Sequence, residues 1–311
     1  MNIIRGLYNC QKAHQNGVLT IGNFDGLHLG HQKIFEQLKV EACKHDTFSS
    51  LMTFEPLPRE YFSKGDSASR LMNRCEKMRI LSSLPPAIRP DNLIFLNFNR
   101  ELASMSAADF IEKILVETLK VKAVIIGDDF RFGCDRQGDF ELLKQFGEKH
   151  HFSVASIESH IIKNQRASST LIREALLDNR LQDAEHMLGR AYTICGHVNH
   201  GDKRGRTIGF PTANIHLRRS ETPLRGVYSV TMHSSKFGDV AGIANLGRRP
   251  TVDGTRVQLE VHLFDFHQSI YGERVCVSFQ HKIRDEKKFD SFDELKQQIL
   301  IDVETARKLL L

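Results

Sequence analysis

Apolar runs alternate with helical repeats along the first half of the chain. Five apolar segments predict buried strands, at residues 18–22 (VLTIG), 49–54 (SSLMTF), 92–98 (NLIFLNF), 121–127 (VKAVIIG) and 152–157 (FSVASI). Between these segments, apolar residues recur three or four positions apart, which predicts helices with one buried face. Strands separated by helices are typical of a parallel, doubly wound α/β sheet.

Three helical faces can be read from this spacing. Ser106, followed by Asp109, resembles a capping box and predicts where the third helix begins. The faces consist of Ile34, Leu38 and Ala42 in the first helix, Leu71, Cys75 and Met78 in the second, and Phe110, Ile114, Leu115, Thr118 and Leu119 in the third.

After about residue 190 the pattern changes to short segments in which apolar and polar residues alternate, bounded by Gly, Pro and Asn. In one of them, Leu259, Val261 and Leu263 point to one face, and Glu260, His262 and Phe264 point to the other. Such strands, without helices between them, predict an antiparallel barrel or sandwich. A C-terminal helix that packs on this domain is predicted by a capping box and an apolar face, which consist of Ser291, Glu294, Leu295, Ile299, Val303 and Ala306.

Length and composition support two globular domains. The 311 residues are 41% hydrophobic and 26% charged, which excludes a disordered chain, and we place the boundary between residues 1–185 and 186–311. A formal charge of +5 does not single out a partner. The sequence contains no apolar stretch of signal-peptide or membrane-helix length, which predicts a cytoplasmic protein. Its six cysteines form no CxxC pair, so we expect reduced thiols rather than a zinc or redox site.

The segment TIGNFDGLHLGHQKIFEQL runs from a predicted strand through a glycine-rich turn into a helix. Gly22, Gly26 and Gly30 allow close approach of the backbone to a ligand, and a helix N-terminus presents free N–H groups to a phosphate. His28 and His31 are three residues apart, so both rings can face the same anion. The alternative is a plain turn with two histidines in solvent. A zinc site is disfavoured because HExxH and a third nearby ligand are both missing.

A second anion site is predicted in RASSTLIREAL. Ser168, Ser169 and Thr170 lie just ahead of a predicted helix and Arg173 in its first turns, so hydroxyl, backbone and guanidinium donors converge there. An ordinary helix cap followed by a surface arginine would explain the same residues.

A third motif lies at the start of the second half. Gly201, Gly205 and Gly209 can form a loop over phosphates, and Thr212 with Asn214 places two oxygens on one strand face. Oxygen ligands of this kind suit Mg²⁺ that is held together with ATP. A glycine-rich hairpin with a polar turn is the alternative interpretation.

The His-x-Gly-His turn and the later Ser/Thr-x-x-x-Arg helix start resemble the nucleotidylyltransferase superfamily. The turn also resembles the class I aminoacyl-tRNA synthetase signature, but a KMSKS-like loop is missing. Nearly the whole chain resembles the bacterial bifunctional riboflavin kinase and FMN adenylyltransferase family, also called FAD synthetases. This resemblance rests on GNFDGLHLGH, FEPLPREYF, IGDDFRFG and SSTLIREAL in the first half, and on GRTIGFPTAN, NLGRRPT, LEVHLFDF and KIRDEKKF in the second.

The resemblance implies an α/β nucleotidylyltransferase domain that makes FAD from FMN, followed by a β-barrel that makes FMN from riboflavin, with ATP as co-substrate of both. His28, His31 and Arg173 would act on the ATP phosphates, Glu260 would be the general base, and Thr212 and Asn214 would hold Mg²⁺. A solvated strand carboxylate is the alternative for Glu260. The expected flavin and nucleotide contacts are Gly22, Asn23, Phe24, Asp25, Gly26, Gly30, Asp129, Ser168, Ser169, Thr170, Gly201, Gly205, Arg206, Gly209, Phe210, Pro211 and Arg284.

Three residues depart from the family pattern, namely Leu57, Ala167 and Arg248. Leu57 puts the substrate contacts of residues 56–59 in doubt. One alternative function retains a single activity, with the other half as a flavin-binding or regulatory module. Another is nucleic-acid binding through Lys203, Arg204, Arg206, Arg218, Arg219, Arg248 and Arg249, which would show a steep dependence on salt. We expect neither a nucleic acid nor a membrane as partner, and a monomer or weak homo-oligomer.

Overall fold

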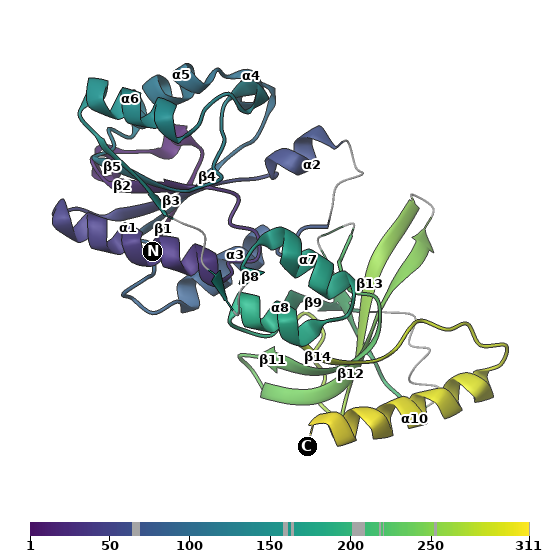
Figure 1. Ribbon diagram of the computed structural model, residues 1–311. Helices are drawn as coiled ribbons and strands as arrows, with labels where there is room; N and C mark the ends of the chain where they lie inside the picture. The colour runs from purple at the N-terminus through teal and green to yellow at the C-terminus, as the bar shows by residue number, and fades with distance from the viewer. Residues whose placement is uncertain are drawn as a thin grey trace. The chain divides into compact units, whose positions relative to one another are not determined.

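The computed structural model divides the chain into two compact units, each of which is described by itself (Figure 1). The structure describes residues 1–63, 69–157, 161–162, 165–200, 209–217, 219, 221–251 and 254–310. The first unit comprises Met1–Ser67 and Lys77–Ala167, and the second comprises Ala68–Glu76 and Ser168–Leu311.

A parallel sheet forms the centre of the first unit. Its strand order is β1-β4-β3-β2-β5-β6, with every neighbouring pair parallel. The strands are β1 (Asn2–Arg5), β2 (Val18–Ile21), β3 (Ser49–Phe54), β4 (Asn92–Leu96), β5 (Ala123–Gly127) and β6 (Ser153–Ile157). A separate antiparallel pair is formed by β7 (Ile161–Ile162) and β8 (Gln165–Arg166). The predicted doubly wound parallel sheet is therefore confirmed.

Helices lie on both faces of this sheet, as Figure 1 shows for α1 and α6. The helices are α1 (Leu29–Lys44), α2 (Pro58–Phe62), α3 (Arg74–Ser83), α4 (Arg100–Ser104), α5 (Ala107–Asp109), the π-helix η3 (Phe110–Thr118) and α6 (Phe140–His150). Short 3₁₀ turns are η1 (Leu7–Asn9), η2 (Lys12–His14) and η4 (Cys134–Arg136). On one face, Leu38 and Ala42 of α1 pack on Val18 and Ile125, while the larger apolar core fills the other face.

The two edge strands of the sheet differ in their environment from the central strands. Every residue of β2, β3 and β4 is buried, as expected for strands that are covered on both faces. The strand predicted at residues 152–157 is present as β6, but its predicted burial is wrong, because β6 pairs only with β5 and is largely exposed. The other edge strand, β1, has only one buried residue and therefore carried no periodic signal.

The predicted face of the second helix is also wrong. Leu71 precedes α3, and the residues buried at its start are Glu76 and Lys77. Apolar periodicity missed this face because its charged groups are buried with partners. Ser106 begins α5 as predicted, and its hydroxyl accepts a hydrogen bond from the Asp109 backbone N–H.

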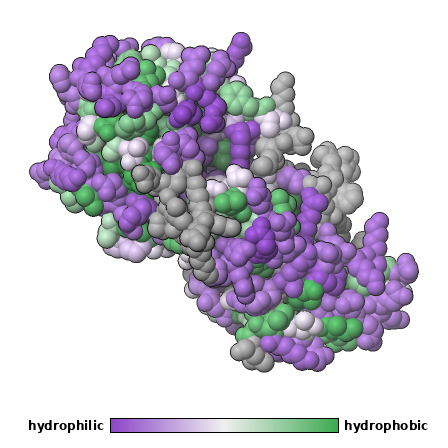
Figure 2. All heavy atoms as spheres, in the orientation of Figure 1, coloured by the Kyte–Doolittle hydropathy of each residue, from purple (hydrophilic) through white to green (hydrophobic). Residues whose placement is uncertain are grey.

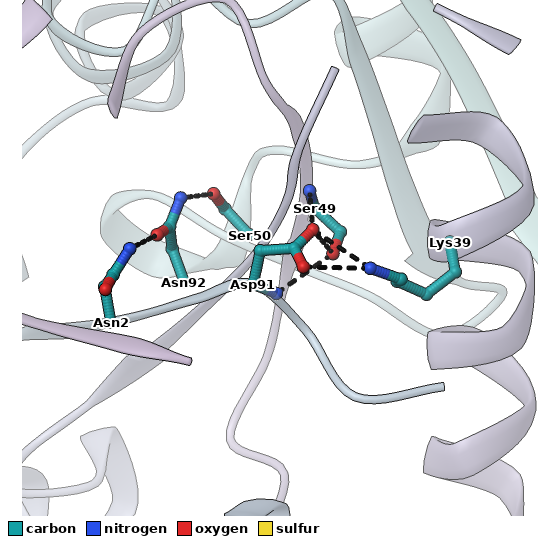
Figure 3. Close-up of polar contacts among 6 residues, drawn as sticks. All are labelled: Asn2, Lys39, Ser49, Ser50, Asp91 and Asn92. Carbon is teal, nitrogen blue, oxygen red and sulfur yellow. Dashed lines mark hydrogen bonds and ion pairs between the residues drawn. The ribbon is translucent and has the colours of Figure 1, made fainter. Parts of the chain in front are cut away.

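Asp91 links three elements at the amino ends of the parallel strands (Figure 3). Its carboxylate accepts hydrogen bonds from the backbone N–H and hydroxyl of Ser49, at 2.9 and 2.7 Å, and pairs with Lys39 of α1 at 2.9 Å. Beside it, Asn92 donates to the Ser50 hydroxyl and accepts from Asn2, which extends the network to β1. Burial alone would raise the pKa of the Asp91 carboxyl, but the bonds from Ser49 and Lys39 outweigh it and hold this pKa below its usual value.

The second unit contains a closed antiparallel barrel and a C-terminal helix, as the alternating pattern predicted. The strand order is β10-β13-β12-β11-β14-β9. These strands are β9 (Thr193–Asn199), β10 (Ala213–His216), β11 (Gly226–Ser234), β12 (Gly238–Thr251), β13 (Gly254–Leu263) and β14 (Arg274–Arg284). The helices are α7 (Ser169–Leu177), α8 (Leu181–Leu188) and α10 (Phe292–Leu310).

The barrel is packed inside and partly covered outside. Tyr228 and Phe279 are buried in its interior, where their rings meet edge to face. On the outside, Ala306 of α10 packs with Val227 and Ile243, which confirms that the C-terminal helix lies on the barrel.

Two of the six cysteines form a disulfide, so the expectation of six reduced thiols is wrong. Cys195 of β9 and Cys276 of β14 lie directly opposite each other in the antiparallel ladder, with their Cα atoms 4.1 Å apart. The other four cysteines are free. The two cysteines are 81 residues apart in sequence, so no short spacing motif predicts the disulfide.

A buried carboxylate accepts a hydrogen bond from the backbone of β9. Glu76 accepts a hydrogen bond from the Cys195 backbone N–H at 2.8 Å and forms an ion pair with Arg219. Both charged side chains are 1% exposed, and Arg219 also donates to the Tyr192 hydroxyl. Residues far apart in the sequence are therefore joined by this pair within the second unit.

Apolar residues occur on the visible surface only in small, separate patches, and the rest of that face is mainly hydrophilic (Figure 2). Within the described residues, no helix is both long enough and apolar enough to cross a membrane.

We predict that Asp91→Asn lowers stability at neutral pH by about 1 kcal/mol, because the group is partly screened by solvent. The folded-state pKa of Asp91 lies below that of the unfolded chain, near 4, so its contribution is present above that pH and is lost as pH falls through the folded pKa. Thermal unfolding between pH 7 and pH 3 should show the two proteins converge in acid. The exposed control Glu148→Gln should show little difference at any pH; a constant gap for Asp91→Asn would contradict the prediction.

We predict that Glu76→Ala destabilises the second unit by about 3–5 kcal/mol, because Arg219 keeps its buried charge without this partner. Calorimetric or urea unfolding measures the loss. Glu304→Ala is the control, since Glu304 and Lys308 form an ion pair that is at least 70% exposed, and it should cost less than about 1 kcal/mol. Equal stability losses in the two variants would show that the buried Glu76–Arg219 pair contributes no more to stability than an exposed ion pair.

Candidate functional site

The predicted phosphate turn lies where the order of the parallel strands reverses. From β2 the chain adds β3 and β4 on one side of the sheet, whereas β5 and β6 lie on the other. The turn of residues 22–28 follows β2, and Asp129 follows the adjacent strand β5. Both segments thus leave the carboxyl edge of the sheet at its switch point, where open α/β sheets bind their ligands.

His28 and His31 are brought together at the start of α1. His28 is the N-cap of the helix, and its Nδ1 accepts a hydrogen bond from the His31 backbone N–H at 3.3 Å. The two rings are stacked with centroids 3.6 Å apart, and His31 also meets Phe24 edge to face. The geometry confirms that both imidazoles lie on one side of the helix N-terminus, where the helix dipole favours an anion.

The backbone of the turn is tightly folded. Phe24, Gly26 and Leu27 all have positive φ, at 45°, 89° and 45°. A side chain at Gly30 would approach the His28 ring and the Ala167 carbonyl oxygen, at 3.1 and 3.3 Å. The glycine at position 30 therefore keeps the first turn of α1 close to the His28 ring.

Three charged side chains hold this turn in place, and of these only Lys77 had no signal in the sequence. Asp25 is 3% exposed and accepts a hydrogen bond from Arg59 of α2 at 2.7 Å. The buried Lys77 ammonium donates to the Asn23 carbonyl at 2.7 Å and to the Thr53 hydroxyl at 3.0 Å. Leu57, the departure that left this region in doubt, is buried ahead of α2, and Arg59 nevertheless contacts the turn.

A group of aromatic side chains follows β3 and β4 on the same edge of the sheet. Tyr61 and Phe62 of α2 both meet Phe98 edge to face, and Phe98 meets Phe54 of β3. Phe62 is 64% exposed. Adjacent aromatics after Pro58 were a usable signal in the sequence, because exposed aromatic faces suit a planar ring.

The second predicted anion site lies in the second unit. Ser168 is the N-cap of α7, and its hydroxyl accepts a hydrogen bond from the Leu171 backbone N–H at 3.2 Å. Ser169 and Thr170 are the first helical residues, and Arg173 follows one turn later. The helix start is as predicted, and the anion-binding role of these four residues stays a prediction.

In the barrel, strand register aligns a polar row on the outer face. Asn214 lies opposite Asn199 on one side and Glu260 on the other, and Glu260 lies opposite Asn245. Directly paired residues on neighbouring strands share a face and lie about 4.8 Å apart along the sheet. The full row is Asn199, Asn214, Glu260, Asn245, Val227 and Arg284, and its one apolar member, Val227, packs against α10.

Two predicted residues of this row share a donor. Nε2 of Gln258 donates to Glu260 Oε1 at 2.6 Å and to Asn214 Oδ1 at 2.9 Å. Thr212 precedes β10 by one residue, so it lies two residues from Asn214 as expected. The oxygens of Thr212, Asn214 and Glu260 are of the hard type that Mg²⁺ prefers.

The segment before β10 contacts the same strand face. Phe210 meets the ring of His262 edge to face, and the Pro211 carbonyl lies 2.9 Å from His262 Nδ1. His262 is outward-facing on β13, two residues from Glu260. Gly201, Gly205 and Arg206 lie outside the described residues, whereas Gly209 is described and has a φ of 89°.

Arg284, an expected flavin or nucleotide contact, has a partner in the C-terminal helix. Its Nε donates to Asp302 Oδ2 at 2.8 Å, and its Nη2 approaches the same carboxylate at 2.7 Å. Asp302 is 2% exposed and also accepts from Gln298. This pairing anchors the end of β14 to α10, and a ligand contact by Arg284 stays a prediction.

The basic residues of the nucleic-acid alternative are not a single solvated group. The Arg219 side chain is buried in its ion pair with Glu76, which corrects its assignment to a basic surface. Lys203, Arg204, Arg206 and Arg218 lie outside the described residues, as do the side chains of Arg248 and Arg249.

Two family models match the chain without overlapping. A FAD synthetase model matches residues 10–171, and a riboflavin kinase model matches residues 188–310.

Similar proteins cover the whole chain. A Haemophilus influenzae protein described as bifunctional riboflavin kinase/FMN adenylyltransferase is 48% identical over 307 residues, covering 99% of this chain and 98% of its own. An Escherichia coli protein with the same description is 44% identical over 309 residues, covering 99% and 97%. A crystal structure described as a macrolide-efflux protein from Streptococcus pneumoniae is 32% identical, with a TM-score of 0.83 and 99% coverage of both chains.

Proposed function

Because the chain belongs to the family of bifunctional riboflavin kinases and FMN adenylyltransferases, and makes both FMN and FAD, we propose a division of these activities between its halves. Residues 1–185 transfer AMP from ATP to FMN, and residues 186–311 transfer the γ-phosphate of ATP to riboflavin. The two matches that do not overlap support this division.

In the first half, we assign the ATP phosphates to the N-terminus of α1. A phosphate oxygen of FMN attacks the α-phosphorus of ATP, and pyrophosphate leaves. His28, His31 and the free N–H groups of the helix stabilise the charge that develops on phosphate oxygens, and no protein nucleophile is needed. The turn that follows β2, with Gly22, Asn23, Phe24, Asp25, Gly26 and Gly30, contacts the nucleotide, as does Asp129.

The aromatic group of α2 suits the flavin in this half. Tyr61, Phe62 and Phe98 lie at the carboxyl edge of β3 and β4, the edge that also carries the phosphate turn. An isoalloxazine ring is planar and apolar on its faces, so exposed aromatic side chains can stack on it.

In the second half, Glu260 is the general base. As the riboflavin 5′-hydroxyl oxygen attacks the γ-phosphorus, its proton passes to the Glu260 carboxylate and ADP leaves. The register that places Glu260 beside Asn214 on the outer face of the barrel is the observation that carries this assignment. Gly209, Phe210 and Pro211 lead directly into this face, and Arg284 ends the same row.

Magnesium fits the oxygen donors of this site. Thr212 and Asn214 would hold it, and the Asn214 oxygen already lies beside the Glu260 carboxylate through their shared donor. The ion supplies charge neutralisation to the ATP phosphates when it is bound. We further propose a monomer or weak homo-oligomer in the cytoplasm, where the ATP that both reactions consume is made.

We predict that Glu260→Gln lowers FMN formation from riboflavin by at least about 100-fold, because a general base contributes that much. FAD formation from added FMN should be unchanged. A chromatographic time course of riboflavin, FMN and FAD with ATP and Mg²⁺ measures both steps, and Glu273→Gln, elsewhere on the barrel, is the control. Equal loss of both steps would contradict the assignment.

We predict that His31→Ala lowers FAD formation by about 100-fold to 1,000-fold while FMN accumulates, by analogy with removal of an oxyanion-hole donor. The same time course measures this effect. His45→Ala, at the other end of α1, should leave both steps intact. An unchanged rate of FAD formation in His31→Ala would show that His31 does not stabilise the ATP phosphates.

A further inference from the structure

We propose that Gln258 is a positioning residue for riboflavin phosphorylation, because its side-chain amide holds the general base and a metal ligand in fixed relative positions. This inference rests on the proposed function of Glu260 and Asn214. Gln258 lies on β13, two residues before Glu260, and therefore on the same outer face of the barrel.

One nitrogen serves both oxygens. Nε2 of Gln258 lies 2.6 Å from Glu260 Oε1 and 2.9 Å from Asn214 Oδ1. An amide NH₂ carries two hydrogens, so it can donate to both acceptors at once. The bond to the carboxylate is charge-assisted and correspondingly strong.

The shared donor links two acceptors on directly paired residues. Asn214 Oδ1 and Glu260 Oε1 are both negatively polarised, so these two oxygens do not attract each other. The Gln258 amide bridges them without adding a net charge. Each oxygen retains lone pairs, which leaves Asn214 able to bind a cation and Glu260 able to accept a proton.

The neighbouring strand places its smallest residue beside this amide. The residue opposite Gln258 on β12 is Gly247, and the carboxylate of Glu286 occupies the space that a side chain at position 247 would fill. Gln258 is itself half-buried. Both of its hydrogen bonds are made to side chains of the barrel.

The test compares three substitutions in the full-length protein. Gln258→Met keeps the length of the side chain but removes both donors, and Gln258→Glu keeps its shape but places a second carboxylate beside Glu260. Gln280→Met is the matched control, since Gln280 lies half-buried on β14 of the same barrel and donates to the Thr231 hydroxyl at 2.9 Å.

We predict that Gln258→Met lowers kcat for riboflavin phosphorylation by about 10-fold or more, while KM for riboflavin changes less than twofold. Gln258→Glu should lose more, because like charges then face each other. Calorimetric titration with Mg²⁺ and ADP should show weaker binding in Gln258→Met. The FMN to FAD step and riboflavin binding, measured by flavin fluorescence, should be unchanged, and Gln280→Met should match the unsubstituted protein throughout.

Other results would overturn the inference. Unchanged kcat in Gln258→Met, with phosphorylation lost in Glu260→Gln, would remove Gln258 from the site but leave the proposed function standing. Full phosphorylation in Glu260→Gln would overturn the proposed site and Gln258 with it. Equal loss of riboflavin binding and kcat in both Gln258 variants would indicate a merely structural role. Circular dichroism identifies a variant that fails to fold, and Gln258→Glu, which conserves packing, then decides alone.

Discussion

Hydrogen bonding between strands is the constraint on which both candidate sites depend. Parallel pairing aligns the carboxyl ends of β2 and β5, so the turn with His28 and the segment with Asp129 leave the sheet at one edge. Antiparallel pairing aligns Asn214, Glu260 and Asn245 on one outer face of the barrel. A shift of one residue in β13 would turn Glu260 into the apolar interior, so the site depends on this register.

Buried charges connect these sheets to the rest of each unit. In the first unit, Lys77 binds the backbone of the turn after β2, and Asp25 of this turn pairs with Arg59. In the second, Glu76 accepts a hydrogen bond from the Cys195 backbone of β9, and Asp302 binds Arg284 and so links α10 to the end of β14. Each of these groups is partnered, as burial of a charge requires. The polar residues near the sites therefore divide into those that bear on chemistry and those that keep the backbone in place.

Much of the architecture was predictable from local patterns. The central strands β2 to β5 are continuous apolar runs, and α10 has a regular apolar face, so periodicity located them. Periodicity failed where the hydrophobicity of a segment does not match its burial. The edge strand β6 is apolar but exposed, and the start of α3 is charged but buried. The Cys195–Cys276 disulfide depends on register between distant strands, which no local pattern encodes.

The sequence by itself determined the fold class, the order of the two halves and the motifs that carry His28, His31, Asn214 and Glu260, because these follow from short-range spacing and from the family resemblance. Only the tertiary structure decided which side chains support them. Lys77 reaches the Asn23 carbonyl across 54 residues, and Gln258 reaches Asn214 across 44. Such contacts arise when strands and helices that are distant in the chain are packed together, and the geometry of a hydrogen bond is set by that packing rather than by neighbours in the sequence.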